Sequence, residues 1–229
     1  MKIENKPSAY GFLAGLLVLL LAAFANASCA HASPLTSRGL TARYAEAVEI
    51  SAVCVREDGA IGGWSGSGVI VSRTRILTAA HVAGSRGAFC VFSTKTIDGT
   101  ERMVQPAVVL PDLDIASMTI LDGETPFDFS PLAYGARPSL GDTVCAATAV
   151  PWRGHKCGEV QPDSSTPGDI KFFVVVEPGN SGSGLYNAAG ELVGIVTHRF
   201  FCGGSNQTCG GKAASLAGHV DELLERTPA

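Results

Sequence analysis

A glycine-rich run at residues 178–184, Pro-Gly-Asn-Ser-Gly-Ser-Gly, surrounds Ser181. Glycine adopts backbone angles that other residues avoid, and it lets another main chain approach closely. A serine on such a turn can attack a carbonyl carbon, while the N–H groups of Gly179 and Ser181 bind the oxyanion that forms. The same run is equally typical of an ordinary hairpin turn, so acyl-transfer chemistry requires a base and an acid elsewhere in the chain.

His81 and Asp114 are the candidates for that base and that acid. His81 follows the run Leu-Thr-Ala-Ala at 77–80, whose small residues allow close packing behind the imidazole. A neutral imidazole with an unperturbed pKa of about 6.5 is suited to general-base work. Asp114 begins the apolar run Asp-Ile-Ala, where its carboxylate can be buried against the imidazole. Asp112, two residues earlier, is the alternative acid.

The composition indicates a packed domain and argues against nucleic-acid binding. Hydrophobic residues make up 46% of the 229-residue chain and charged residues 17%, with 27 glycines that suit short strands and tight turns. The net charge of −4 and the scattered Lys and Arg residues provide no basic surface for a polyanion. We expect neither a metal nor a cofactor.

Residues 1–32 have the order of a secretory signal peptide. Two lysines precede an apolar run at 12–25, and small residues follow it. This run is shorter than the roughly 20 residues that span a membrane. We therefore expect cleavage after Ala27 or Ala32 and a secreted or periplasmic product without a stable membrane span. Lipidation at Cys29 is the alternative, which we disfavour because the residue three positions before it is not a branched aliphatic.

Six cysteines follow the predicted signal peptide, and an even set in an exported protein indicates disulfide bonds. Six cysteines permit several pairings, and pairing by neighbourhood gives Cys54–Cys90, Cys145–Cys157 and Cys202–Cys209. None of them has the spacing of a zinc site. Paired sulfurs have no thiolate, so none is a candidate nucleophile.

Short apolar runs separated by turns dominate the rest of the chain and predict an all-β fold. The runs lie at 50–55, 68–71, 75–78, 88–92, 104–110, 115–121, 143–150, 172–176, 184–186 and 192–197. A polar, proline-bearing stretch divides them into two blocks, which suggests two β-barrels or sandwiches joined by a linker. Leu216, Val220, Leu223 and Leu224 recur at helical spacing, so we expect a closing amphipathic helix.

Taken together, these motifs resemble those of the trypsin-like (chymotrypsin-fold) serine proteases, and in detail the bacterial secreted trypsin-like peptidases. The resemblance rests on the order His81, Asp114, Ser181 and on the runs GSGVIV at 66–71, TAAHV at 78–82, DIA at 114–116 and GNSGSGL at 179–185. It covers almost the whole chain after the signal peptide. The Asp-aliphatic-Ala pattern begins at Asp114, which favours this residue over Asp112 as the acid.

The resemblance implies two six-stranded antiparallel β-barrels, with the active site between them and a C-terminal α-helix. It places a peptidase domain at 33–229, with barrels at about 44–125 and 141–212, a linker at about 126–140 and the helix at about 214–226. It implies a serine endopeptidase that acts on protein or peptide substrates, and we expect this enzyme to be secreted and monomeric. In this enzyme Ser181 attacks the carbonyl, His81 transfers the proton, Asp114 orients His81, and Gly179 and Ser181 form the oxyanion hole.

Two positions depart from the digestive members of the family. Asn180 replaces the aspartate that pairs with a newly formed N-terminal ammonium, and no Ile-Val-Gly-Gly occurs. Because an amide cannot form that ion pair, we expect no activation by clipping to a new N-terminus. Ser183 replaces a glycine of many relatives, and we expect it to alter the turn rather than the chemistry.

The resemblance places the primary substrate pocket at Val175, Thr197, His198 and Arg199. An apolar Val175 at its base argues against a preference for Lys or Arg. His198 and Arg199 either favour an acidic substrate side chain or point to solvent. The alternative function is a catalytically inactive binding module with the same fold. An esterase is disfavoured because the strand–elbow–helix setting of G-x-S-x-G is missing from the sequence.

Overall fold

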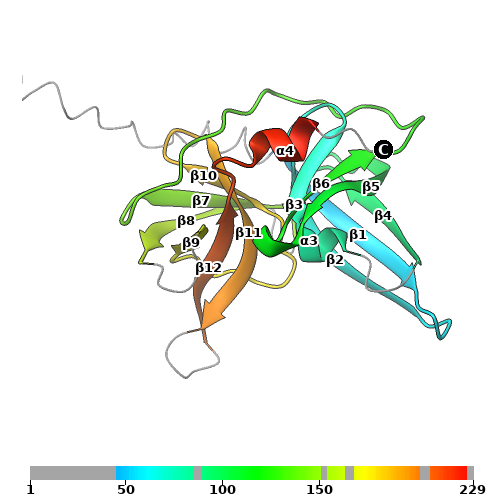
Figure 1. Cartoon of the computed structure of the whole chain (residues 1–229), viewed down its shortest axis with the longest axis horizontal. Coiled ribbons are helices and arrows are strands. Elements are labelled where there is room, and N and C mark those ends of the chain that lie inside the picture. The colour runs from blue at the N-terminus through cyan, green and yellow to red at the C-terminus, as the bar shows by residue number, and fades with distance from the viewer. Residues whose placement is uncertain (1–44, 85–88, 151–153, 163–167, 202–206, 226–229) are drawn as a thin grey trace, which may run out of the picture. The chain divides into compact units, whose positions relative to one another are not determined.

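The computed structural model describes residues 45–84, 89–150, 154–162, 168–201 and 207–225, and within these ranges β-strands dominate (Figure 1). The predicted signal peptide and Cys29 lie outside the described ranges. Among the helices of the described ranges, none is long and apolar enough to cross a membrane.

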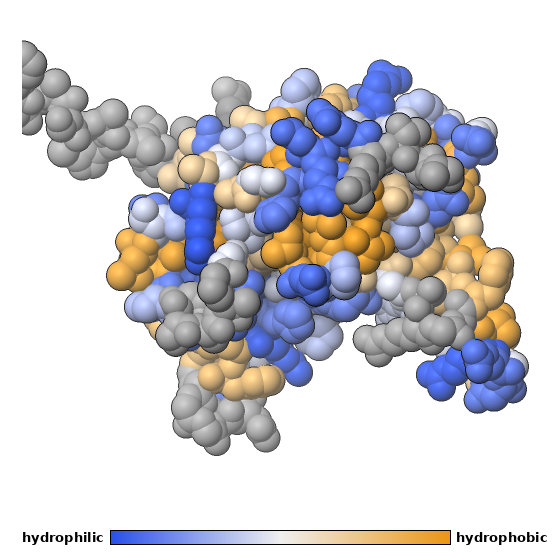
Figure 2. Space-filling view, viewed as in Figure 1, coloured by the Kyte–Doolittle hydropathy of each residue, from blue (hydrophilic) through white to orange (hydrophobic). Residues whose placement is uncertain are grey.

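The first barrel is a closed antiparallel sheet in the order β1-β2-β3-β6-β5-β4. Its strands are β1 (Ala47–Val55), β2 (Ile61–Ile70), β3 (Arg75–Ala79), β4 (Phe89–Lys95), β5 (Glu101–Leu110) and β6 (Ile115–Ile120). Alternation along β1 buries Val48, Ile50 and Ala52 inside the barrel. The outward positions at one end of β1, β2 and β4 are apolar as well, and they form exposed apolar surface on the right of Figure 2: Val53, Val55, Ile61, Phe89 and Val91.

The second barrel closes in the order β10-β11-β12-β9-β8-β7. Its strands are β7 (Thr143–Thr148), β8 (Gly154–Gln161), β9 (Asp169–Phe172), β10 (Gly184–Asn187), β11 (Leu192–Phe201) and β12 (Thr208–Ser215). All of its strand pairs are antiparallel. The predicted fold of two six-stranded antiparallel barrels is therefore confirmed.

One apolar cluster includes residues of both barrels. Leu77 and Ile115 of the first barrel belong to the same buried cluster as Leu192 and Ile195 of the second, and none of these four side chains is exposed. Burying a large aliphatic side chain contributes about 1.5–3 kcal/mol to stability. This shared cluster packs β3, β6 and β11 together, and His81 and Asp114 lie just beyond the paired ends of β3 and β6.

The closing helix is shorter than the sequence predicts. Helix α4 spans Val220–Glu225, whereas the predicted helix began at about 214; residues 214 and 215 belong instead to β12. Gly218 separates strand and helix with a φ of +82°, a left-handed conformation that a right-handed helix does not contain. Leu216 and Leu223 are nevertheless both buried in the shared cluster, so the apolar spacing reflects one buried face assembled from two elements.

Two of the three predicted disulfide bonds are present. Cys54–Cys90 joins directly opposed residues of β1 and β4, and Cys145–Cys157 joins directly opposed residues of β7 and β8. Each bond therefore fixes the register of one strand pair. The third predicted pair involves Cys202, which lies outside the described residues.

Candidate active site

His81 and Asp114 are brought together by the pairing of β3 with β6. Ala79 at the end of β3 pairs with Ile115 at the start of β6, so the residues just beyond these two positions share one edge of the barrel. There the main-chain N–H of Ala80 donates to the carbonyl oxygen of Asp114 at 3.0 Å. His81 itself lies in α3 (Ala80–Ala83), a short helix that directly follows β3.

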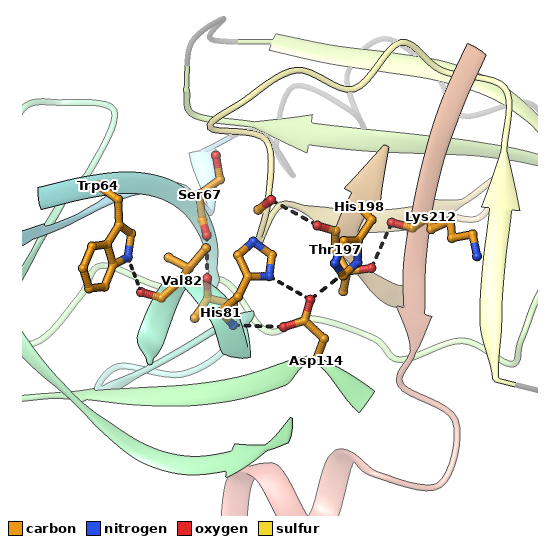
Figure 3. A network of polar contacts seen from close by, with 10 residues as sticks. Trp64, Ser67, His81, Val82, Asp114, Thr197, His198 and Lys212 are labelled. Atoms are coloured by element: carbon orange, nitrogen blue, oxygen red, sulfur yellow. Dashed lines mark hydrogen bonds and ion pairs between the residues drawn. The ribbon is translucent and has the colours of Figure 1, made fainter. Parts of the chain in front are cut away.

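Asp114 contacts both the ring and the main chain of His81 (Figure 3). One carboxylate oxygen, Oδ2, lies 2.8 Å from His81 Nδ1, and the other, Oδ1, accepts the main-chain N–H of His81 at 2.9 Å. Asp114 has a left-handed backbone with φ +53°, which caps the 3₁₀ helix η1 (Pro111–Leu113) and turns the carboxylate toward the histidine. Asp112 is exposed on that helix.

The carboxyl group of Asp114 remains ionised. Burial by itself raises its pKa, but hydrogen bonds from the ring and the main-chain N–H of His81 outweigh burial and hold the pKa below its ordinary value. A charged carboxylate beside Nδ1 keeps the ring proton on that nitrogen, which leaves Nε2 free to accept a proton.

The glycine-rich turn of Ser181 is held against β2 of the first barrel. Ser67 of β2 donates its main-chain N–H to the carbonyl oxygen of Ser181 at 2.7 Å and its hydroxyl to that of Gly179 at 2.8 Å. Gly182 has a φ of +92°, and a Cβ atom at this position would lie 1.8 Å from the carbonyl oxygen of Ser67. Only glycine therefore fits, and this close approach places Ser181 beside the first barrel.

The hydroxyl of Ser181 donates a hydrogen bond to the carbonyl oxygen of Thr197 in β11, at 3.1 Å. In this rotamer the hydroxyl proton is not directed at His81. Nucleophile–base hydrogen bonds are often long or unformed without substrate, and they tighten in the complex. Rotation about one side-chain bond is the change that would release the hydroxyl from Thr197.

Two main-chain N–H groups of the turn have no hydrogen-bond acceptor within the described part of the chain, namely those of Gly179 and Ser181. Their neighbour Asn180 donates its own N–H to the carbonyl oxygen of Glu177 at 3.0 Å, which shapes the turn. Gly179 has a φ of +97° and packs against Val150. Two unused donors beside a serine are the arrangement that binds a developing oxyanion.

The side chain of Asn180 is buried, and each of its two polar atoms makes a hydrogen bond. Its exposed fraction is 3%; its Oδ1 accepts the N–H of Glu177 at 2.8 Å and its Nδ2 donates to the carbonyl oxygen of Val150 at 2.6 Å. The amide thus connects the two segments that flank Gly179. In the sequence, Asn180 is notable only because an amide cannot pair with an N-terminal ammonium. Its partner Val150 is only the last residue of a predicted apolar run.

The four residues of the predicted substrate pocket occupy different environments. Val175 is 48% exposed, whereas Thr197 is buried and donates its hydroxyl to the carbonyl oxygen of Lys212 at 3.3 Å. The guanidinium of Arg199 lies over the ring of Phe201, 5.1 Å from its centroid. His198 points at Asp114, with its Nδ1 3.7 Å from Oδ2 (Figure 3). The preferred substrate side chain stays a prediction.

Comparison with known protein families gives a match over more than half of the chain. The family of trypsin-like peptidase domains matches residues 66–195, a range that includes Ser67, His81, Asp114 and Ser181. No curated protein sequence matches this chain.

Solved structures of an HtrA-type protease share the fold. AlgW with a tripeptide is 26% identical with a TM-score of 0.61, and the match covers 83% of this chain and 62% of that chain. A serine-to-alanine variant of AlgW with a decapeptide has a TM-score of 0.63 at 20% identity, over 79% of this chain and 63% of that chain. The present chain thus spans less than two thirds of the length of these structures.

Proposed function

Because this chain belongs to the family of trypsin-like peptidase domains, we propose that it is a serine endopeptidase with Ser181 as nucleophile, His81 as base and Asp114 as orienting acid. One observation carries the assignment. Asp114 Oδ2 lies 2.8 Å from His81 Nδ1, and Asp114 Oδ1 accepts the His81 main-chain N–H at 2.9 Å. The turn of Ser181 is hydrogen-bonded to β2 of the same barrel.

The proposed reaction proceeds through an acyl-enzyme. Ser181 Oγ turns from the Thr197 carbonyl oxygen, gives its proton to His81 Nε2 and attacks the carbonyl carbon of the peptide bond. The N–H groups of Gly179 and Ser181 donate to the oxyanion, and His81 returns the proton to the leaving amine. Water then attacks the ester by the same route. Asp114 stabilises the imidazolium in both steps and stays ionised.

The position of Asn180 supports a site that forms without a new N-terminus. In digestive relatives this position carries a carboxylate that needs an ammonium partner. Here the amide is satisfied by two main-chain groups, the N–H of Glu177 and the carbonyl oxygen of Val150. The oxyanion turn is therefore held by uncharged hydrogen bonds, and proteolytic clipping is not needed to order it.

Asn180→Asp is expected to destabilise the protein and to lower its activity. One oxygen of the new carboxylate could still accept the Glu177 N–H, but the other would face the Val150 carbonyl oxygen at the position where Nδ2 now donates, which buries a negative charge beside an acceptor. The expected loss in the free energy of unfolding is about 3 kcal/mol, measured by urea denaturation. An Asn180→Asp protein of unchanged stability that gains activity after N-terminal clipping would contradict this account.

Two further observations support a proposal for the substrate and one for the location of the protein. The AlgW structures contain a tripeptide or a decapeptide, which supports a protein or peptide as the substrate here. The two disulfide bonds are typical of an oxidising compartment, and they support export by the predicted signal peptide at 1–32.

Labelling with a fluorophosphonate probe tests the function directly. Such a probe reacts with an activated serine and forms a stable phosphonyl ester, so an active enzyme takes up one probe per chain. We expect labelling at Ser181, located by mass spectrometry, and its loss in His81→Ala. A folded protein that takes up no probe would instead be the inactive binding module. Cleavage of esters but not of peptides would favour an esterase.

A further inference from the structure

A second imidazole lies beside the carboxylate that orients His81, and the proposed reaction has no use for it. His198 Nδ1 is 3.7 Å from Asp114 Oδ2, and the ring centroids of His198 and His81 are 5.5 Å apart (Figure 3). The pairing of β11 with β12 shifts in register between Val196 and His198. Such irregularities redirect side chains, and here the histidine points toward the site.

We propose that His81, Asp114 and His198 bind a divalent transition-metal ion, with Zn²⁺ the ion that best suits the site, and that its binding blocks catalysis. One potential ligand atom from each residue lies within 4.8 Å of the other two. Two imidazole nitrogens and one carboxylate oxygen form a ligand set typical of zinc sites that leave the fourth position to water.

The distances between these atoms suit a tetrahedral ion after small movements. Two ligands bound to zinc at about 2.0–2.1 Å lie roughly 3.3 Å apart. The separations from Asp114 Oδ2 are 2.8 Å to His81 Nδ1 and 3.7 Å to His198 Nδ1, so they fall on either side of this value. The remaining approach, between the two rings, requires rotation of His198, whose side chain is 65% exposed.

Charge and access also favour a cation at this position. An aspartate carboxylate carries a negative charge at neutral pH, which attracts a cation. The side chains of His81 and Asp114 retain exposed fractions of 35% and 20%, which leaves a path from solvent. Mg²⁺ and Ca²⁺ prefer sites made of oxygen ligands, so this nitrogen-rich site discriminates against them.

Metal binding would remove the base from the reaction. When Nδ1 of His81 donates its lone pair to zinc, the single proton of the neutral imidazole resides on Nε2. That nitrogen then has no lone pair to accept the proton of Ser181, and Asp114 no longer orients the ring. The inhibitory part of this inference rests on the proposed peptidase function, whereas the binding part does not.

Zinc binding to the Ser181→Ala protein, followed by calorimetry, tests the site independently of activity. We expect one Zn²⁺ per chain, with affinity lowered at least about 10-fold in the double variant that also carries His198→Ala. His155→Ala is the matched control, because it removes an exposed histidine of β8 outside the cluster. Equal affinities in the His198 and His155 variants would overturn the proposal.

Inhibition is then measured on proteins that retain Ser181. Each variant is compared with its own rate in EDTA, so that any effect of His198 on substrate binding cancels. The zinc concentration for half-inhibition should rise at least about 10-fold in His198→Ala, with no inhibition by Mg²⁺ or Ca²⁺ at the same concentration. If the enzyme is active and zinc inhibits His198→Ala as strongly as the unchanged protein, the zinc site is refuted and the peptidase function is not. If zinc binding depends on His198 but the unchanged protein has no peptidase activity, the proposed function is refuted and the zinc site is not.

Discussion

Replacement of Ser181 by alanine should abolish peptide cleavage while leaving the fold intact. The hydroxyl oxygen is the atom that attacks the carbonyl, so its removal is expected to lower kcat by about 10⁶-fold. The folded protein loses only the hydrogen bond to the Thr197 carbonyl oxygen, which is worth about 1 kcal/mol. Progress curves with a peptide substrate give the rate, and thermal denaturation monitors the fold.

Ser183→Ala is the matched control, because it makes the same change two residues along the same turn. The side chain of Ser183 is fully buried, and its Oγ has no hydrogen-bond partner among the described residues. Removing this oxygen should leave both kcat and thermal stability near those of the unchanged protein. If Ser181→Ala retained its activity, the nucleophile would have to be sought elsewhere.

Asp114→Asn should lower kcat by about 10⁴-fold. The asparagine Oδ1 can still accept the His81 main-chain N–H, but an NH₂ group facing Nδ1 favours the tautomer with the proton on Nε2. That tautomer cannot accept the proton of Ser181. Asparagine tolerates the left-handed backbone of this position nearly as well as aspartate, so the loss should appear in kcat rather than in folding.

The matched control for this prediction is Asp112→Asn, which removes an equal charge from an exposed position two residues earlier. Its kcat should stay within a few-fold of the unchanged protein, because an exposed charge in water interacts only weakly with its neighbours. A large loss in Asp112→Asn together with a mild one in Asp114→Asn would reverse the choice of acid. Steady-state kinetics on both variants decide between them.

Several features of this protein follow from short stretches of sequence. The barrel strands β1 and β6 contain enough buried apolar residues to be predicted. Cys54–Cys90 and Cys145–Cys157 each join two cysteines that follow one another in the order along the chain, 36 and 12 residues apart. His81 and Asp114 adjoin apolar strands, so their places at strand ends were predictable. In each case the information is local: a period of two residues, a short spacing or a glycine that permits a turn.

Two strands of the second barrel have no counterpart among the predicted runs, and a third, β9, shares only Phe172 with the predicted run at 172–176. In β8 most side chains are exposed, so the apolar alternation that marks a strand is missing, and its pairing with β7 is what places it. In β12 the glycines carry no hydrophobic signal, yet they are needed: a Cβ atom at Gly210 would lie 2.3 Å from the carbonyl oxygen of Phe172. That close packing is a tertiary constraint.

By itself, the sequence determined the type of chemistry, because a glycine-rich turn, a histidine and an aspartate at strand ends each have a local signature. Only the tertiary structure decided which groups those residues meet. It placed Ser67 against the turn of Ser181 and let main-chain groups satisfy Asn180. It also brought His198, which the sequence predicts to line the substrate pocket, to 3.7 Å from Asp114. Such contacts depend on how two barrels close and where a strand shifts register, which no local pattern of residues encodes.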